Sequence, residues 1–440
     1  MHRSRDRRRS GQAFGSYRGA SGSLLDLDYV NNRYFGRTLA QHIGGRVSTA
    51  FTPDADGFYH LTQPTELRRT NAGFLLEHGS TNSVLNSWLQ GAAVGLPGTL
   101  PNGWAASAPT GTTLSVENID VFKGLPVIDL RLKGTATGGG FQVRFGGLSD
   151  IAAGSGQNWV CSAFLQLLER TNLNDLGLTI QALNNSSVGV ASNDTGNIFS
   201  DLGEWSRPYA SLVGTPLGTT KIVGLLASGQ DFSGGVELDE LIRIAVPQVE
   251  QWDPLISDEP FPTTPIKTTG VAAARDFEHA HVSLDGLGLT DEFTCIVIGR
   301  MPPGVRKLGT HVQFSSANAM PHHVLGMRTA NDGTHMEIHV IAFDETPTLR
   351  ANVPLPAPGT RFCGAFSVKG NAIALSINGG SVNSLVSTHP VLDGYVSMFI
   401  CGTWGGVHQA EAPVERIIVL PGQVSDGDLS SYSIASRWDA

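Results

Sequence analysis

The chain has 440 residues, of which 40 % are hydrophobic and only 16 % are charged, and it contains 53 glycines and 23 prolines. Low charge combined with many turn-forming residues is typical of β proteins, and the length suffices for two or three domains. The formal net charge of −9 argues against nucleic-acid binding by the body of the protein, because phosphate binding requires a basic surface. No apolar run is long enough to insert into a membrane and no secretory signal follows the N-terminal arginines, so we expect synthesis in the cytoplasm.

The four cysteines lie far apart in the sequence, inside apolar runs such as TCIVIG and SMFICG. They are Cys161, Cys295, Cys363 and Cys401. A zinc site would favour Cys-x-x-Cys spacing, which is absent here, and disulfides belong to oxidising compartments. The pattern therefore predicts buried free thiols.

Residues 1–23 carry six arginines against one acidic residue, Asp6, and are rich in Ser and Gly. Such a segment cannot bury enough surface to order itself, so we expect a basic extended arm. Three roles are open: docking onto an acidic partner in an assembly, a plain disordered tail, and nucleic-acid binding. Docking is the favoured role. Salt-insensitive attachment would exclude nucleic acid, since phosphate contacts weaken steeply with salt. The arginines assigned to docking are Arg3, Arg5, Arg7, Arg8 and Arg9.

Residues 24–85 are predicted to form an adaptor region of short strands. Leu25, Leu27 and Tyr29 alternate with two aspartates, which is the pattern of a strand with one apolar face. The run TPDADG at 52–57 has the chemistry of a tight turn, since Pro fixes φ and Gly accepts positive φ. Its aspartates could also hold calcium, but the rest of an EF-hand loop is missing, and a turn is the preferred interpretation.

Two β-sandwiches are predicted further along the chain, over residues 86–250 and 277–440. Both contain runs of strand length bounded by Gly, Asn or Ser, such as WVCSAF from Trp159. The strongest hairpin signal is Asn378-Gly379-Gly380, because Asn and Gly tolerate positive φ. The predicted fold class is therefore all-β, with two β-sandwich (jelly-roll) domains in series preceded by the basic arm.

Residues 251–276 join the two predicted sandwiches and contain four prolines, Pro254, Pro260, Pro262 and Pro265. Each proline removes a backbone donor and fixes φ, so neither a helix nor a central strand fits this segment. Proline-rich segments are extended and semi-rigid. We therefore expect a spacer that holds the two domains at a defined separation.

Two groups of short motifs resemble parts of bacteriophage and gene-transfer-agent virion proteins. One group resembles the start of these proteins and the other resembles the junction that closes their first β domain. Both stand in the order of that family, although the Ser-Tyr that usually precedes the junction is absent. The motifs are LDLDY (25–29), TPDADG (52–57), GFLLE (73–77), STN (80–82) and NSW (86–88), and then PQVE (247–250), PT (262–263) and ARD (274–276).

Two further resemblances concern the fold of the sandwiches. The first resembles a carbohydrate-binding-module jelly roll, and residues 378–432 of the second resemble the concanavalin/laminin-G type. These likenesses imply glycan or protein binding, in some relatives with calcium. The virion resemblance implies contacts to other virion proteins through the arm, a homotrimer, localisation in the virion and synthesis in a host cytoplasm.

Tryptophans in loops are the candidate carbohydrate-binding residues, because sugars stack on indole faces. Trp404 in GTWGG is the first candidate, followed by Trp104 in PNGW and Trp205 in GEWSRP. Packing in the core is the alternative for each of them, since large aromatic side chains are mostly buried. Trp159 lies inside a predicted strand and is assigned to the core.

His335, Glu337 and His339 share one face of a predicted strand, because side chains alternate with period two. Two imidazoles and a carboxylate could ligate zinc. Adjacency on a strand is a weak indicator of a metal, however, and a polar surface or subunit interface is the preferred interpretation. We predict no cofactor, with calcium left open.

No catalytic motif supports an enzyme: nucleophile elbow, phosphate loop, zinc-protease and dinucleotide signatures are all absent from the sequence. Glu237 and Asp239 would share a strand face, but the sequence does not set the separation that glycoside hydrolysis needs, and a solvated face is preferred. The sequence therefore predicts a non-enzymatic head or tail fibre or spike protein that binds host-surface polysaccharide. A capsule-depolymerising glycanase and a purely structural virion adaptor remain as alternatives.

Overall fold

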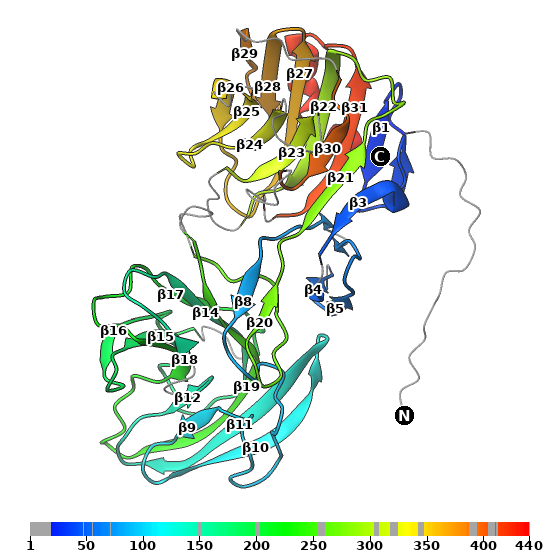
Figure 1. The fold of residues 1–440 in the computed structure, drawn as a ribbon. Helices are drawn as coiled ribbons and strands as arrows, with labels where there is room; N and C mark the ends of the chain where they lie inside the picture. Colours follow the sequence, from blue (N-terminus) through cyan, green and yellow to red (C-terminus); the bar gives the residue numbers. More distant parts are fainter. Residues whose placement is uncertain are drawn as a thin grey trace, which may run out of the picture.

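The computed structural model describes residues 19–440, apart from 47, 55, 71, 148–150, 199–202, 254–259, 303–307, 317–323, 342–346, 387–393, 404–409, 411 and 440. It is nearly all β and forms two lobes, each a β-sandwich (Figure 1). The predicted all-β class with β-sandwich domains is confirmed. Helical structure in the described residues is limited to α1 (Asp426–Tyr432) and the short 3-10 helices η1 (Leu39–Gln41) and η2 (Ala435–Trp438).

The first sandwich consists of two antiparallel sheets that face each other across a hydrophobic core. We call them the β19 sheet and the β18 sheet. The β19 sheet has the order β10 (Thr112–Phe122), β11 (Leu125–Ala136), β19 (Val236–Gln251), β14 (Trp159–Glu169) and β17 (Tyr209–Leu212). The β18 sheet has the order β16 (Gly189–Asp194), β15 (Gly177–Leu183), β18 (Lys221–Ala227), β12 (Gln142–Arg144) and β9 (Ala105–Ser107), with β13 (Ile151–Ala152) beside β18.

The second sandwich is also built from two antiparallel sheets, the β22 sheet and the β24 sheet. The β22 sheet has the order β2 (Arg33–Phe35), β1 (Leu25–Asp28), β31 (Val414–Pro421), β22 (Glu292–Arg300), β27 (Arg361–Lys369), β28 (Ala372–Ile377) and β29 (Asn383–Val386), and β7 (Gly73–Phe74) pairs with β31 and β6 (Arg69–Thr70). The β24 sheet has the order β26 (Pro347–Pro354), β25 (His335–Ile341), β24 (Val324–Thr329), β23 (Thr310–Ser315), β30 (Ser397–Ile400), β21 (His279–Ser283) and β3 (His42–Gly45).

Alternation of side chains builds the core of the second sandwich. Phe293 and Phe314 face each other from the two sheets with ring centroids 4.9 Å apart, and both are fully buried. The predicted hairpin is present, because β28 pairs with β29 and the connection contains Asn378 and Gly379 at φ 52° and 74°. Both residues adopt positive φ, which a tight hairpin turn requires.

The N-terminal strands belong to the second sandwich, although the chain reaches the first sandwich in between. Leu25 of β1 pairs with Val419 of β31, and β3 pairs with β21. The alternating residues of β1 are fully buried, and Asp26 forms an ion pair with Arg416 of β31 at 2.8 Å. The sequence boundaries placed residues 24–85 in a separate adaptor region. In the structure, strands from this region complete both sheets of the second sandwich, so the first sandwich is an insertion.

Two pairs of short strands connect the lobes. They are β4 (Ala50–Pro53) with β5 (Tyr59–Thr62), and β8 (Ser80–Asn82) with β20 (Ala273–Arg275). The β4–β5 hairpin covers the outer face of the β19 sheet, where Phe51 packs against Trp88 at 4.7 Å and Tyr59 packs against Phe164 at 5.3 Å. Aromatic packing thus attaches a hairpin from the N-terminal region to the inserted sandwich.

Candidate functional site

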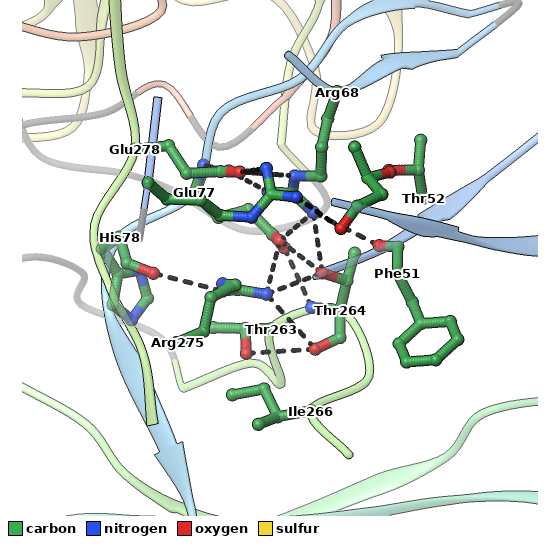
Figure 2. Close-up of polar contacts among 12 residues, drawn as sticks. Phe51, Thr52, Arg68, Glu77, His78, Thr263, Thr264, Ile266, Arg275 and Glu278 are labelled. Atoms are coloured by element: carbon green, nitrogen blue, oxygen red, sulfur yellow. Dashed lines mark hydrogen bonds and ion pairs between the residues drawn. The ribbon is translucent and has the colours of Figure 1, made fainter. Parts of the chain in front are cut away.

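The junction between the sandwiches is built around buried charged side chains (Figure 2). Arg68 is fully buried and Arg275 is 1 % exposed. Glu77 lies between these two guanidinium groups, at 2.7 Å from Arg68 and 2.9 Å from Arg275. Burial alone would raise the pKa of Glu77, but the attraction of Arg275 and Arg68 outweighs it and holds that pKa far below its usual value. The carboxylate therefore remains charged inside the junction.

Glu278 completes the ionic part of this network. Its carboxylate accepts hydrogen bonds from Arg68 Nε at 2.9 Å and from Arg46 Nη1 at 2.8 Å. It also accepts the backbone N–H of Glu77 at 3.0 Å. Arg46 in turn donates to the carbonyl oxygens of Thr62 and of the residue after it. Buried charges are tolerated only when they are paired and hydrogen-bonded, and these groups meet that condition.

A second set of polar contacts holds residues 260–268 against β19. Glu250 accepts hydrogen bonds from Thr263, from Oγ1 at 2.6 Å and from N–H at 3.1 Å. Gln248 accepts the N–H of Ile266 at 2.9 Å. Asn82 of β8 donates to the carbonyl oxygen of Ile266 at 3.1 Å and accepts the N–H of Val249. Strand β19, strand β8 and the segment 260–268 are therefore tied together.

The Pro-rich segment does not act as an extended spacer in its described part. Phe261 and Ile266 are 9 % and 5 % exposed, and Thr268 is 1 % exposed and bonds to Ser87 at 2.8 Å. The prolines instead shape a segment whose side chains and backbone fill the junction. The reason lies in hydrogen bonds that Thr263 makes to Glu250, that Thr264 makes to Glu77, and that the Ile266 backbone makes to Gln248 and Asn82. Pro254 lies outside the described residues.

The motif residues behind the virion resemblance come together in this junction. Glu77, Asn82, Glu250 and Arg275 belong to four different motifs, and each makes a buried contact described above. Sequence reasoning did not single out Arg68, Arg46 or Glu278. Their only sequence signal is a charged residue beside apolar ones, and Glu278, the partner that Arg68 and Arg46 share, lies more than 200 positions away from both.

The predicted carbohydrate-binding tryptophans are not brought together. Trp404 lies outside the described residues, as do the five arginines assigned to docking. Trp104 is 7 % exposed and packs edge-to-face on Phe145 at 5.1 Å in the core of the first sandwich. Its buried indole has little ring surface left for a sugar, and the PNGW loop therefore supplies a core residue.

Trp205 lies on the outer face of the β19 sheet, at the end covered by the β4–β5 hairpin. Its indole stacks on Phe164 at 5.4 Å and meets the edge of Phe122 at 5.0 Å. One ring face is thus already occupied by protein. Trp159 lies in the core, as predicted, and is 4 % exposed.

Strand β25, which carries His335 and His339, does not form a metal site in the described residues, where no group of three metal-ligating side chains is found. His335, Glu337 and His339 share a face of β25, as alternation predicts. Glu337 is fully buried and accepts a hydrogen bond from Arg328 Nε at 2.8 Å, and His339 Nδ1 lies 3.1 Å from a backbone oxygen. Glu337 and His339 are therefore buried and partnered, and they do not form the exposed polar surface expected from the sequence.

The carboxylates considered for catalysis and calcium have local partners. A hydrogen bond from Lys133 lowers the pKa of Asp239, whereas a glycosidase general acid needs a raised pKa. Glu237 accepts a hydrogen bond from Thr135 at 2.6 Å. Asp54 accepts the backbone N–H groups of Asp56 and Phe58 in its own turn. These contacts agree with the preferred interpretations of a strand face and a turn.

All four cysteines are free and fully buried, which confirms the prediction of buried thiols. Burial raises the pKa of each of them, to about 12 for Cys363 and Cys401. The thiolate is the reactive form, so these groups are expected to be inert in the folded chain.

Three of the larger clefts on the described surface lie near the candidate residues. The first, of about 940 Å³, lies between the β4–β5 hairpin and η1 and is lined by polar groups such as Asp54, His60 and Arg69. The second, of about 590 Å³, lies where the first sandwich meets β8. The third, of about 560 Å³, runs beside Trp104 and is lined by both apolar and polar groups. No helix among the described residues is long and apolar enough to cross a membrane.

No protein-family model matches this chain, and no curated protein matches it. Solved structures with local similarity include domain 4 of AbnA, a GH43 extracellular arabinanase from Geobacillus stearothermophilus, at 16 % identity and a TM-score of 0.29, covering 40 % of this chain and 84 % of that one. The laminin α1 domains LG4–5 from mouse show 13 % identity and a TM-score of 0.24, and the match covers 60 % of this chain and 81 % of that one. The CBM22-1–CBM22-2 tandem of Xyn10C from Paenibacillus barcinonensis shows 11 % sequence identity and a TM-score of 0.23, and the match covers 80 % of this chain and 97 % of that one.

These neighbours are carbohydrate-binding modules and laminin G-like jelly-roll domains. At such low identities and TM-scores they do not assign the chain to a family. What the chain's own geometry establishes is an all-β protein of two sandwiches, one inserted into the other, with a buried ionic junction.

Proposed function

We propose that this chain is a virion-associated fibre or spike protein that binds glycan on a host surface. The observation that carries the proposal is the junction. The residues behind the virion resemblance are those that lock the two sandwiches together, including Glu77, Glu250 and Arg275. A resemblance confined to exposed turns would weigh less, because buried charged residues with fixed partners are demanding to build.

The fixed orientation that the junction gives to the two sandwiches suits multivalent attachment. A single sugar site binds near millimolar, about −4 kcal/mol, which is too weak to retain a particle. Repetition of such a site raises effective affinity by about 10² to 10⁴, provided that the sites can engage together. A junction fixed by paired buried charges keeps the two sandwiches in one orientation, and a homotrimer would repeat that orientation around an axis.

The test uses the intact purified chain on a glycan array that spans neutral and acidic polysaccharides, together with cryo-electron microscopy of particles from the producing culture. We expect at least one saccharide to be bound and the chain to lie on the exterior of the particle. A location in the head interior or inside the tail tube would refute attachment. An array without any binder at high protein density would favour the purely structural adaptor.

Enzymatic activity is tested with the same material. Incubation of the intact chain with a bound polysaccharide should release no reducing ends, because no carboxylate pair suited to glycoside hydrolysis has been identified among the described residues. Measurable release would make the protein a glycan depolymerase instead.

A further inference from the structure

The cleft of about 590 Å³ at the first sandwich has the chemistry of a binding site. Strand β8 supplies Ser80 and Thr81 on one side, and the loop 156–158 supplies amide side chains on another. The third side is the end of β19 with Trp252. Hydroxyl, amide and indole groups thus surround one space, and none of them belongs to the ionic network around Arg68.

Two tryptophans of this cleft have indole N–H groups without an acceptor. Trp159 and Trp252 are 4 % and 9 % exposed, and in the described part of the chain neither Nε1 has a hydrogen-bond partner. Trp159 packs in the core of the first sandwich, whereas Trp252 belongs to none of the hydrophobic clusters formed by described residues. A buried N–H without an acceptor is unfavourable. Trp252 is therefore the aromatic group best explained by a ligand.

The amide side chains of the cleft are oriented by their oxygen atoms. Gln157 Oε1 accepts the N–H of Gly154 at 2.7 Å, and Asn158 Oδ1 accepts the N–H of Gly214 at 2.8 Å. A backbone N–H can bond only to the amide oxygen, so the NH₂ group of each side chain is left for another partner. Within the residues described, neither NH₂ group has one. The cleft thus presents fixed donors.

We propose that this cleft is a subsite for a neutral sugar residue, an inference that rests on the proposed glycan binding. Hydroxyl oxygens of a sugar would accept hydrogen bonds from the amide NH₂ groups and from Trp252 Nε1. Asp253 is the only charged side chain among the described residues that line the cleft. No Lys, Arg or His is among these described lining residues, so an acidic sugar would find no cationic side chain in the lining of the cleft.

The test compares variants of the intact chain by ligand-observed NMR titration. The probes are neutral gluco-, manno- and galacto-oligosaccharides and a glucuronate oligosaccharide. Trp252→Phe keeps a ring but removes the N–H donor, and should weaken binding of the neutral probe about three- to tenfold. Gln251→Ala alters an exposed side chain of the same cleft and should weaken it about two- to fivefold. Trp438→Phe is the matched control, with no expected change, because Trp438 lies in η2 of the second sandwich and its indole N–H donates to the carbonyl oxygen of Tyr432 at 2.8 Å.

The outcomes separate this inference from the proposed function. Loss of affinity in Trp252→Phe and in Gln251→Ala, with Trp438→Phe unchanged, supports the subsite. Unchanged affinity in both cleft variants, while the intact chain still binds a saccharide, overturns the subsite and leaves glycan binding standing. Preference for the glucuronate probe also overturns it. Absence of binding to every saccharide by the intact chain refutes the proposed function itself. If Trp252→Phe does not fold, Gln251→Ala alone decides.

Discussion

Replacement of Arg68 by methionine should show how strongly the buried charges hold the junction. The variant keeps a long side chain but removes a guanidinium that contacts Glu77 at 2.7 Å and Glu278 at 2.9 Å. Removal of one partner from a buried ion pair costs about 3–5 kcal/mol, because the remaining charge is left buried. Here each carboxylate keeps a second cation, at 2.9 Å from Arg275 and 2.8 Å from Arg46. We therefore expect the low end of that range, about 3 kcal/mol.

Urea unfolding followed by circular dichroism measures this change, and small-angle X-ray scattering reports the arrangement of the lobes. Lys133→Met is the matched control, since Lys133 forms an ion pair with Asp239 at 2.9 Å but is 63 % exposed. An exposed pair contributes less than about 1 kcal/mol. If Arg68→Met and Lys133→Met lost equally little stability and the scattering curve stayed the same, the junction would not be held by its charges.

Three further predictions concern pH, thiols and core packing. Burial lowers the pKa of His311 from 6.5 to about 4. The folded state then binds fewer protons than the unfolded state at pH values between these two numbers. The free energy of unfolding should therefore fall as the pH drops from about 6.5 to about 4. The expected loss of unfolding free energy is on the order of 3 kcal/mol. His42 adds to this loss, because burial also lowers its pKa to about 4. In urea titrations across this pH range, His311→Leu should make the unfolding free energy depend less on pH. A thiol reagent should label no cysteine in the native chain and all four in denaturant, and rapid native labelling would contradict their burial. Gly224→Ala places a Cβ 2.6 Å from Cys161 Sγ and 2.8 Å from Val249, and should lower the free energy of unfolding by about 1–3 kcal/mol. Gly140→Ala is the control, because its Cβ would have nothing within 4 Å and should change little. Equal melting temperatures for the two variants would refute the predicted clash.

The sequence predicted local structure better than long-range arrangement. Alternation in Leu25, Leu27 and Tyr29 and the turn at Asn378 are local signals, and both elements are present. The pairing of β1 with β31 joins residues almost 400 positions apart, and no local pattern encodes it. A reading of the chain in order therefore suggested domains in series, where the structure has an insertion.

The candidate site was harder to predict for the same reason. Trp104 follows Pro-Asn-Gly and resembles a loop residue, yet the neighbouring sandwich core buries it. Trp252 lies at the start of the Pro-rich segment 251–276, where sequence reasoning looked for a spacer and not for a cleft. The ionic junction depends on Arg68 and Glu278, whose meeting is decided by tertiary structure alone.

The insertion also reverses the order in which the lobes would stand on a particle. Gly19, where the described chain begins, lies against Phe35 of β2, and the C-terminal η2 contacts Arg416 of the adjoining β31. The described chain therefore begins and ends at the second sandwich (Figure 1). On the proposed virion role, a chain anchored by its N-terminal arm would have the second sandwich as its base and the inserted sandwich as its outward tip, with the cleft at Trp252 on the side of the inserted sandwich that meets β8. Chain order alone would have suggested the opposite.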